Sequence, residues 1–311
     1  MRWLLAIPLL IGAGLAVFLI SVRHTPPPNR YVSGESLVQQ QGRAYLLPVL
    51  ESGSAPVRDT TVPDPTLDAN SVLLYHIESG TELYAKNPDV RVPIASLTKI
   101  MSALVATDLF SPNEIVTVAS ESVRVDGAKQ TLTAGERLRV SDLISMMLVE
   151  SSNDAAYALA AHAQDQGIDF VERMNTKAWV LGMQGCAFRD PAGLDDAAYC
   201  TARDLVRLVR AALRNAPQLW PVMASPAVTI QSVDGSAAKE IKSTDQLLGM
   251  VPGIIGGKTG NTDGALGCLL LVVQSPDKRD TLISIVLGSR QRFTDSAALI
   301  SWAWHAYRWN Q

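Results

Sequence analysis

Strand-forming segments lie towards both ends of this chain, and helix-forming segments fill the region between them. Near the amino end, residues 72–77 and 82–85 flank a Ser79-Gly80 turn, which predicts a hairpin. Strand patterns return only at 266–273 and 281–287. Helical periodicity is found at 96–110, 141–149, 154–162, 170–181 and 201–213, and in a final helix at about 294–309. We therefore expect an α/β (α+β) fold, with one sheet assembled from distant segments and a helical lobe inserted between them.

An apolar run of 20 residues, 3–22, precedes this region, and Ser21 is its only conventional polar residue. As a helix it would be about 30 Å long, the thickness of the hydrocarbon core of a bilayer. The run is typical of a retained membrane anchor or of a cleaved signal peptide. We favour an anchor in the inner membrane because the run ends without the small-x-small pair of a cleavage site. Either alternative sends the rest of the chain across the membrane, into the periplasm, or secretes it.

Proline dominates the segment that follows. Residues 23–70 contain 7 of the 17 prolines, three of them in succession at 26–28. This composition predicts a stiff, exposed periplasmic tether with little core of its own. One apolar island in it, residues 45–50, is a candidate to dock on the domain that follows. We assign the remainder, 71–311, to a single folded domain of roughly 240 residues.

Composition excludes several classes of function. The formal net charge is −3, from 27 Lys and Arg against 30 Asp and Glu, so no nucleic-acid partner is expected. There are 3 cysteines and 4 histidines, and no two histidines lie near each other in sequence. We therefore expect neither a disulfide scaffold nor a metal centre, and no cofactor.

The first candidate motif is Ser96-Leu97-Thr98-Lys99. Residues i and i+3 of a helix share a face, so the lysine amine would lie one turn from the hydroxyl, as a serine nucleophile requires of its base. The same spacing occurs at 236–239 and 275–278, but only Ser96 opens a long apolar run, which predicts a buried helix and a partly desolvated amine. The alternative is that Ser96 is a plain helix N-cap.

Two further motifs are equally short. Ser151-Ser152-Asn153 lies between two helical stretches and offers a hydroxyl for proton relay and an amide for a substrate carbonyl, although it could also be a helix cap. Lys258-Thr259-Gly260 precedes an apolar strand, and Gly256-Gly257 before it would let a ligand approach the backbone closely. Its alternative is a surface turn.

Taken in order, S-x-x-K, S-x-N and K-T-G, the three motifs resemble the signature of the penicillin-binding D-alanyl-D-alanine peptidases. The resemblance extends from about residue 74 to residue 304 and includes Gly193-Leu194-Asp195. It is strongest for the low-molecular-mass carboxypeptidases and endopeptidases. It implies the fold shared with β-lactamases, an antiparallel sheet flanked by helices. The sequence ends with the helix that bears Trp302, which favours the shorter, endopeptidase-like branch.

The resemblance also implies roles for individual residues. Ser96 would be the nucleophile, Lys99 its base and Ser151 the relay of a proton to the leaving amine; the substrate-binding set would be Asn153, Lys258, Thr259, Gly260, Asn261 and Arg292. The backbone N–H groups of Ser96 and Asn261 would form the oxyanion hole. Arg292 would help to bind the terminal carboxylate, or would be a solvated charge at a helix start. The implied substrates are peptidoglycan stem peptides, and β-lactams would be covalent inhibitors.

Two rival functions and one pairing of cysteines stay open. A class A β-lactamase shares the motifs but needs a glutamate-activated water, and residues 188–194 offer no Glu. A non-catalytic penicillin-binding or wall-binding protein should have lost part of the triplet. Cys186 and Cys200 flank a loop of 13 residues and could pair in an oxidising compartment. Cys268 lies inside an apolar strand, and we expect it to be a buried packing residue.

Overall fold

The computed structural model describes residues 55–125, 131–235 and 238–309. The apolar run 3–22, the island 45–50 and Ser236 lie outside the described residues. Within the part that is described, no helix combines the length and the apolar character needed to cross a membrane.

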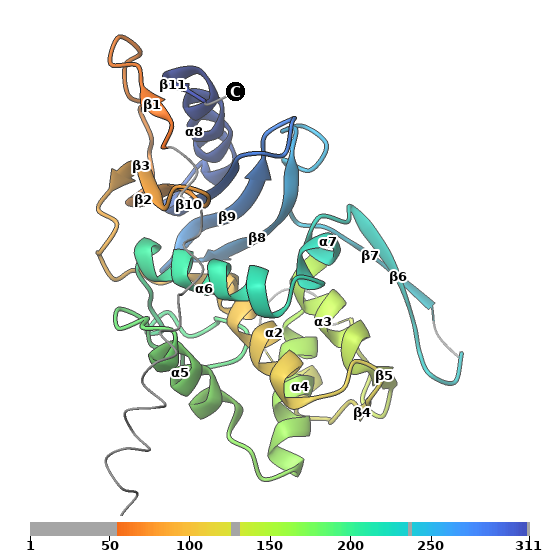
Figure 1. Cartoon of the computed structure of the whole chain (residues 1–311). Coiled ribbons are helices and arrows are strands. Elements are labelled where there is room, and N and C mark those ends of the chain that lie inside the picture. The colour runs from red at the N-terminus through yellow and green to blue at the C-terminus, as the bar shows by residue number, and fades with distance from the viewer. Residues whose placement is uncertain (1–54, 126–130, 236–237, 310–311) are drawn as a thin grey trace, which may run out of the picture. The chain divides into compact units, whose positions relative to one another are not determined.

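A five-stranded antiparallel sheet forms the centre of the domain, and it joins the two ends of the folded chain (Figure 1). Its strand order is β3-β2-β10-β9-β8. The strands are β2 (Ser71–His76), β3 (Thr81–Lys86), β8 (Ile254–Thr262), β9 (Leu266–Gln274) and β10 (Thr281–Ser289). The predicted hairpin is confirmed as β2–β3, and β2 pairs with β10 from the other end of the chain. The expected antiparallel sheet built from distant segments is therefore confirmed.

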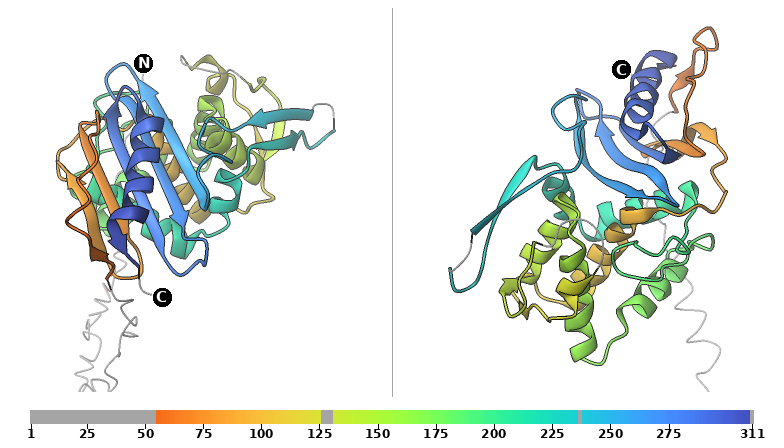
Figure 2. Two further views of the ribbon diagram at one scale, coloured as in Figure 1. Left: turned by 90° about the horizontal axis from the view of Figure 1, so that it is seen from above. Right: turned by 180° about the vertical axis from the view of Figure 1, so that it is seen from behind.

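Helices cover both faces of this sheet (Figure 2). Helix α8 (Arg292–Ala306) packs on one face, and the helical lobe lies on the other. Alternate residues of β9 serve the two faces: Cys268, Leu270 and Val272 join the core beneath the lobe, while Leu269, Leu271 and Val273 join the core beneath α8. Because both faces are buried, the central strands are continuous apolar runs rather than alternating ones.

The helical lobe contains the helices expected from periodicity. They are α2 (Thr98–Leu109), α3 (Val140–Val149), α4 (Asn153–Asp165), α5 (Phe170–Val180) and α6 (Ala202–Asn215), with the one-turn η1 (Ala95–Leu97) before α2. Shorter elements were not predicted: η2 (Ser122–Arg124), α7 (Leu219–Met223), and the hairpins β4 (Ile115–Thr117) with β5 (Arg137–Arg139) and β6 (Ala227–Gln231) with β7 (Ala238–Lys242). These strands are short and bury few side chains, so they leave little hydrophobic pattern.

The last helix ends three residues before the predicted limit. After Ala306 the chain forms β11 (Tyr307–Arg308), which pairs with β1 (Val57–Arg58). Residues 55–70, which the sequence places in the tether, therefore contact the domain: Leu67 and Ala69 are buried in the core beneath α8. This edge pairing joins segments about 250 residues apart, and no sequence pattern near residue 306 predicts it.

Candidate active site

The amine of Lys99 contacts the hydroxyl of Ser96. Ser96 lies in η1 and Lys99 in the first turn of α2, so the i, i+3 spacing brings Nζ to 2.7 Å from Oγ. Nζ also donates to Oδ1 of Asn153 at 2.7 Å and to the carbonyl of Ala192 at 3.0 Å. No side chain cap is made at the start of η1 or α2, so the N-cap interpretation of Ser96 is wrong.

Lys99 has the electrostatic environment of a neutral amine. It is fully buried, and burial lowers its pKa well below the ordinary lysine value, with the positive charge of Lys258 lowering it further and Asp190 opposing the shift. A neutral amine 2.7 Å from a hydroxyl can accept its proton. The pair therefore has the geometry expected of a nucleophile and its general base, and the surroundings of Lys99 disfavour the charged form of its amine.

In the S-x-N motif, the middle residue caps a helix and the other two residues line the cleft. Ser152 is the N-cap of α4, and its Oγ accepts a hydrogen bond of 3.2 Å from the backbone N–H of Ala155. The capping role predicted as the alternative therefore falls on the middle residue. Ser151, with φ of 66°, and Asn153 line the cleft instead, and Asn153 reaches Lys99.

The K-T-G motif lies within β8 rather than in a surface turn. Lys258, Thr259 and Gly260 pair with Leu270, Leu269 and Cys268 of β9. A Cβ atom on Gly260 would approach the carbonyl of Ile94 to 2.9 Å, so glycine allows β8 to lie directly against η1. The surface-turn alternative is wrong.

The expected role of Gly256-Gly257 is also wrong. A Cβ on Gly256 would collide with Trp220 of α7, and one on Gly257 would collide with Leu271 of β9. Both glycines allow close packing within the protein, not the approach of a ligand.

A cleft of about 470 Å³ lies between β8, η1 and the α3–α4 junction. Its lining residues are Ser96, Glu150, Ser151, Asn153, Leu194, Thr244, Thr259, Gly260, Asn261, Thr262, Asp263 and Arg292. Arg292, at the start of α8, donates to Oδ1 of Asn261 at 3.3 Å. Seven of the nine sequence candidates thus line one cleft, and Lys99 touches two of them. Lys258 is buried in the same strand as Thr259, whose carbonyl accepts from its Nζ at 3.1 Å.

Lys258 belongs to a buried group of charges. Burial lowers its pKa to about 7; Asp245 opposes this shift and Arg292 adds to it. Burial raises the pKa of Asp245, while the charge of Lys258 lowers it. Lys258 is therefore held near the point at which its charge changes at neutral pH.

Asp190 fixes the turn that contacts Lys99, and it was not identified from the sequence. The two carboxylate oxygens of Asp190 accept hydrogen bonds from four successive backbone N–H groups, those of residues 192–195, at 2.6–3.0 Å. This network fixes the turn that presents the Ala192 carbonyl to Lys99. Gly193, with φ of 76°, contacts the backbone of Ala95 so closely that no Cβ would fit.

Thr244 and Glu150 were missed as well. Oγ1 of Thr244 lies 2.6 Å from Oγ1 of Thr259 in the cleft, and Glu150 accepts a hydrogen bond of 3.0 Å from Thr131. Neither lies in a recognisable spacing with the three motifs. Glu150 adjoins Ser151, but its residue type alone did not single it out.

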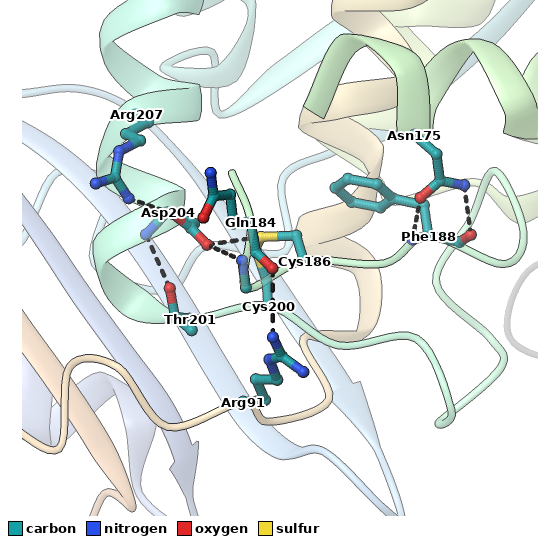
Figure 3. The surroundings of a disulfide bond; sticks show 10 residues. Arg91, Asn175, Gln184, Cys186, Phe188, Cys200, Thr201, Asp204 and Arg207 are labelled. Atoms are coloured by element: carbon teal, nitrogen blue, oxygen red, sulfur yellow. Dashed lines mark hydrogen bonds and ion pairs between the residues drawn. A yellow bond between two sulfur atoms is a disulfide. The ribbon is translucent and has the colours of Figure 1, made fainter. Parts of the chain in front are cut away.

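A disulfide between Cys186 and Cys200 closes the loop that contains Asp190 (Figure 3). This decides the pairing that the sequence left open. Beside the bond, at the start of α6, Asp204 accepts a hydrogen bond of 2.7 Å from the backbone of Gly185. On the cleft side, Asp196 of the same loop accepts from Thr262 and from the backbone of Gly264. Cys268 is buried and unpaired, as expected.

Comparison with known proteins identifies the family. The model of the peptidase S11 family, described as D-alanyl-D-alanine carboxypeptidase, matches residues 58–291. The chain belongs to this family of serine peptidases. It is 32% identical over 257 residues to a D-alanyl-D-alanine endopeptidase of Pseudomonas aeruginosa, covering 81% of this chain and 82% of that protein. It is 29% identical over 281 residues to D-alanyl-D-alanine carboxypeptidase DacC of Escherichia coli, covering 86% and 68%.

Solved structures of D-alanyl-D-alanine peptidases and penicillin-binding proteins share the fold. A D-alanyl-D-alanine carboxypeptidase from Mycobacterium tuberculosis matches with a TM-score of 0.72 and 28% identity over 80% of this chain and 96% of that one. Penicillin-binding protein D2 of Listeria monocytogenes, in its ampicillin-bound form, matches with a TM-score of 0.68 and 32% identity over 78% and 99%. The resemblance drawn from the three motifs is confirmed as membership of this peptidase family.

Proposed function

We propose that this peptidase hydrolyses the bond between two D-alanine-like residues of peptidoglycan stem peptides through an acyl-enzyme on Ser96. The observation that carries the proposal is the buried amine of Lys99, 2.7 Å from Ser96 Oγ at the wall of an open cleft. The comparisons support the substrate class, because relatives named as D-alanyl-D-alanine carboxypeptidases and endopeptidases align over most of the chain.

Acylation would begin with proton transfer from Ser96 to neutral Lys99. Oγ of Ser96 then attacks the scissile carbonyl, and the negative oxygen is received by the backbone N–H groups of Ser96 and Asn261. The tight contact of Gly260 with η1 supports this arrangement, because it holds β8 beside the backbone of Ser96. Ser151 would pass a proton to the departing amine. The C–N bond breaks as that amine leaves, and water later cleaves the ester.

The remaining side chains would hold the substrate. Asn153 shares its oxygen with Lys99, which leaves its Nδ2 for an acyl-side carbonyl of the substrate. Thr259 and Arg292 line the cleft and would receive the carboxylate of the leaving residue, and the charge of buried Lys258, in the same strand as Thr259, would add to the attraction. Arg292 lines the cleft, where its guanidinium already donates to Oδ1 of Asn261 at 3.3 Å.

β-Lactams should acylate Ser96, and the resulting acyl-enzyme should hydrolyse slowly. The loop that would have to supply a water-activating glutamate contains Asp190 instead. Both oxygens of Asp190 already accept backbone hydrogen bonds, so its carboxylate is not available to activate a water. This observation disfavours a class A β-lactamase. Fast hydrolysis of nitrocefin by the purified protein would reverse that conclusion.

Between carboxypeptidase and endopeptidase we propose the endopeptidase, which cuts cross-links. The similarity to the Pseudomonas endopeptidase supports this choice. Purified muropeptides separate the two activities: the wild-type protein should convert cross-linked dimers to monomers, and the S96A variant should not. Loss of terminal D-alanine from pentapeptide monomers, with dimers intact, would show a carboxypeptidase. No change in either substrate would refute the proposed activity.

We also propose that residues 3–22 anchor the protein in the inner membrane and that the catalytic domain works in the periplasm. The disulfide between Cys186 and Cys200 supports an oxidising compartment. Mass spectrometry of the protein extracted from membranes tests the anchor. A chain that retains residues 3–22 is expected, whereas a soluble chain that starts after residue 22 would show a cleaved signal peptide.

A further inference from the structure

Three potential metal ligands converge at the end of the sheet, outside the cleft. His76 ends β2, Glu78 lies in the turn to β3, and Asp280 immediately precedes β10. The pairing of His76 with Leu282 places Asp280 beside the imidazole. Nε2 of His76 lies 3.0 Å from Oε2 of Glu78 and 3.0 Å from Oδ1 of Asp280. The three ligand atoms lie within 4.8 Å of one another.

The other ring nitrogen of His76 is already oriented. Nδ1 lies 2.7 Å from Oγ of Ser79, and that hydroxyl donates to Oγ1 of Thr81 at 3.0 Å. A hydroxyl has one proton, so Ser79 accepts from Nδ1–H of the imidazole. In neutral His76 the lone pair of Nε2 then faces two carboxylates. Metal-binding histidines are held in this way, with the non-ligating N–H donated to a neighbouring oxygen.

The two carboxylates have no lysine or arginine to neutralise them among the described residues. Within the described residues, no lysine or arginine lies within 4 Å of Glu78 or Asp280, and His76 is their only ion-pair partner. The charge of Asp277 adds to the negative potential at Asp280. Glu78 is fixed by the backbone N–H of Thr281, which donates to Oε2 at 2.8 Å. A buried imidazole and two oriented carboxylates therefore leave an excess of negative charge around one point.

We propose that His76, Glu78 and Asp280 form a zinc site. One imidazole nitrogen and two carboxylate oxygens are three ligands that zinc accepts, and zinc–ligand bonds of about 2.0–2.2 Å would need only small outward shifts of atoms now 3.0 Å apart. The side chains of Glu78 and Asp280 are 30% and 16% exposed, so water can supply the fourth ligand. Calcium and magnesium are disfavoured, because they prefer oxygen donors in larger number.

The metal would join two turns at the end of the sheet. Glu78 belongs to the β2–β3 turn and Asp280 to the β9–β10 connection, so one ion would cross-link an edge hairpin to a central strand. The ring of His76 also contacts Trp309, with centroids 5.6 Å apart. The ion would therefore stabilise the domain, and this role does not depend on the proposed peptidase reaction.

Titration of the full-length chain with zinc tests the site. The protein is kept in detergent, treated with EDTA and dialysed, and Zn²⁺ binding is measured by calorimetry beside the melting temperature. E78Q and D280N each remove a ligand charge at a partly exposed position. E240Q is the control, because Glu240 is an exposed carboxylate on β7 that pairs with Lys242 instead. Labelling of Ser96 by a fluorescent penicillin confirms that each variant is folded.

The wild type and E240Q should bind one more Zn²⁺ than E78Q and D280N, or bind it at least tenfold more tightly. Zinc should raise the melting temperature of the first pair alone. Equal binding and equal melting shifts in all four proteins would overturn the proposal, as would an absence of zinc binding in the wild type.

Discussion

The carbonyl oxygen of Ala192 accepts a hydrogen bond of 3.0 Å from Nζ of Lys99, although 93 residues separate the two in the chain. The same amine contacts Ser96 and Asn153, so three segments define its position. A buried amine has no water to replace a lost partner, so each contact influences where its lone pair points. The orientation of the proposed base therefore depends on a loop that contains none of the three motifs.

Replacing Lys99 with Ala should abolish acylation of Ser96. The variant loses the proposed base and leaves the Ser96 hydroxyl protonated, so the rate of labelling by a fluorescent penicillin should fall by about 10²-fold or more. The matched control is K278A. It removes the lysine of residues 275–278, which have the same S-x-x-K spacing and lie within the described part of the chain. Labelling of K99A at the wild-type rate would refute the role of Lys99.

Asp190 should act as a positioning residue for Lys99. In D190N the amide keeps one acceptor oxygen for four backbone N–H groups, so buried donors lose their partners and the folded state should be destabilised by about 2 kcal/mol or more. At a temperature where the variant is still folded, labelling of Ser96 should be about 10²-fold slower, because the Ala192 carbonyl shifts. D195N is the control, since Asp195 accepts a single backbone bond, from Ala197, at 2.8 Å. A stability loss without a slower reaction would show a purely structural role.

The pH dependence of kcat/KM should have two limbs, because the two lysines need opposite charge states. Lys99 acts when neutral, and its pKa is held well below the ordinary value by burial, so activity should rise with pH as Lys99 loses its proton. Lys258 binds a carboxylate when charged, and its pKa is about 7, so activity should fall as the pH rises through about 7. A kcat/KM that still increases to pH 9 would contradict the second assignment.

The D245N variant should move the alkaline limb to lower pH. Asp245 raises the pKa of Lys258, so removing its charge lowers that pKa. The amide oxygen can still accept from the backbone of Leu247, which preserves the local turn. E240Q, at an exposed site on β7, is the control and should leave the pH profile unchanged. If the alkaline limb of D245N stays at the wild-type pH, Asp245 does not influence the pKa of Lys258.

Removing the disulfide should destabilise the domain. The bond joins residues separated by 14 positions, and closure of a loop of this length contributes about 3 kcal/mol. The C186S/C200S variant should unfold at lower urea concentration than the oxidised wild type, and reductant should affect only the wild type. Labelling of the folded variant should persist, because the Asp190 network remains. Equal midpoints for both proteins would show that the loop is held without the bond.

Much of this fold follows from local patterns. The β2–β3 hairpin, the five main helices and the strands β9 and β10 are long or strongly periodic, so their positions were predicted to within a few residues. The short, exposed strands β4 to β7 and the pairing of β1 with β11 were not predicted, because their hydrogen bonds join segments whose own side chains show little pattern. The strand around Lys258 was not predicted, because its glycines interrupt the apolar pattern that is typical of a buried strand.

The sequence by itself determined which groups could carry the chemistry. The three motifs are local, and a spacing of i to i+3 at the start of a helix suffices to bring Lys99 to Ser96. Only the tertiary structure decided what surrounds them: the Ala192 carbonyl, the Asp190 network, the charge of Asp245 beside Lys258, and the convergence of His76 with Asp280. These contacts join residues tens to hundreds of positions apart, and their energies depend on burial. Burial is a property of the packed chain, which no short window of sequence contains.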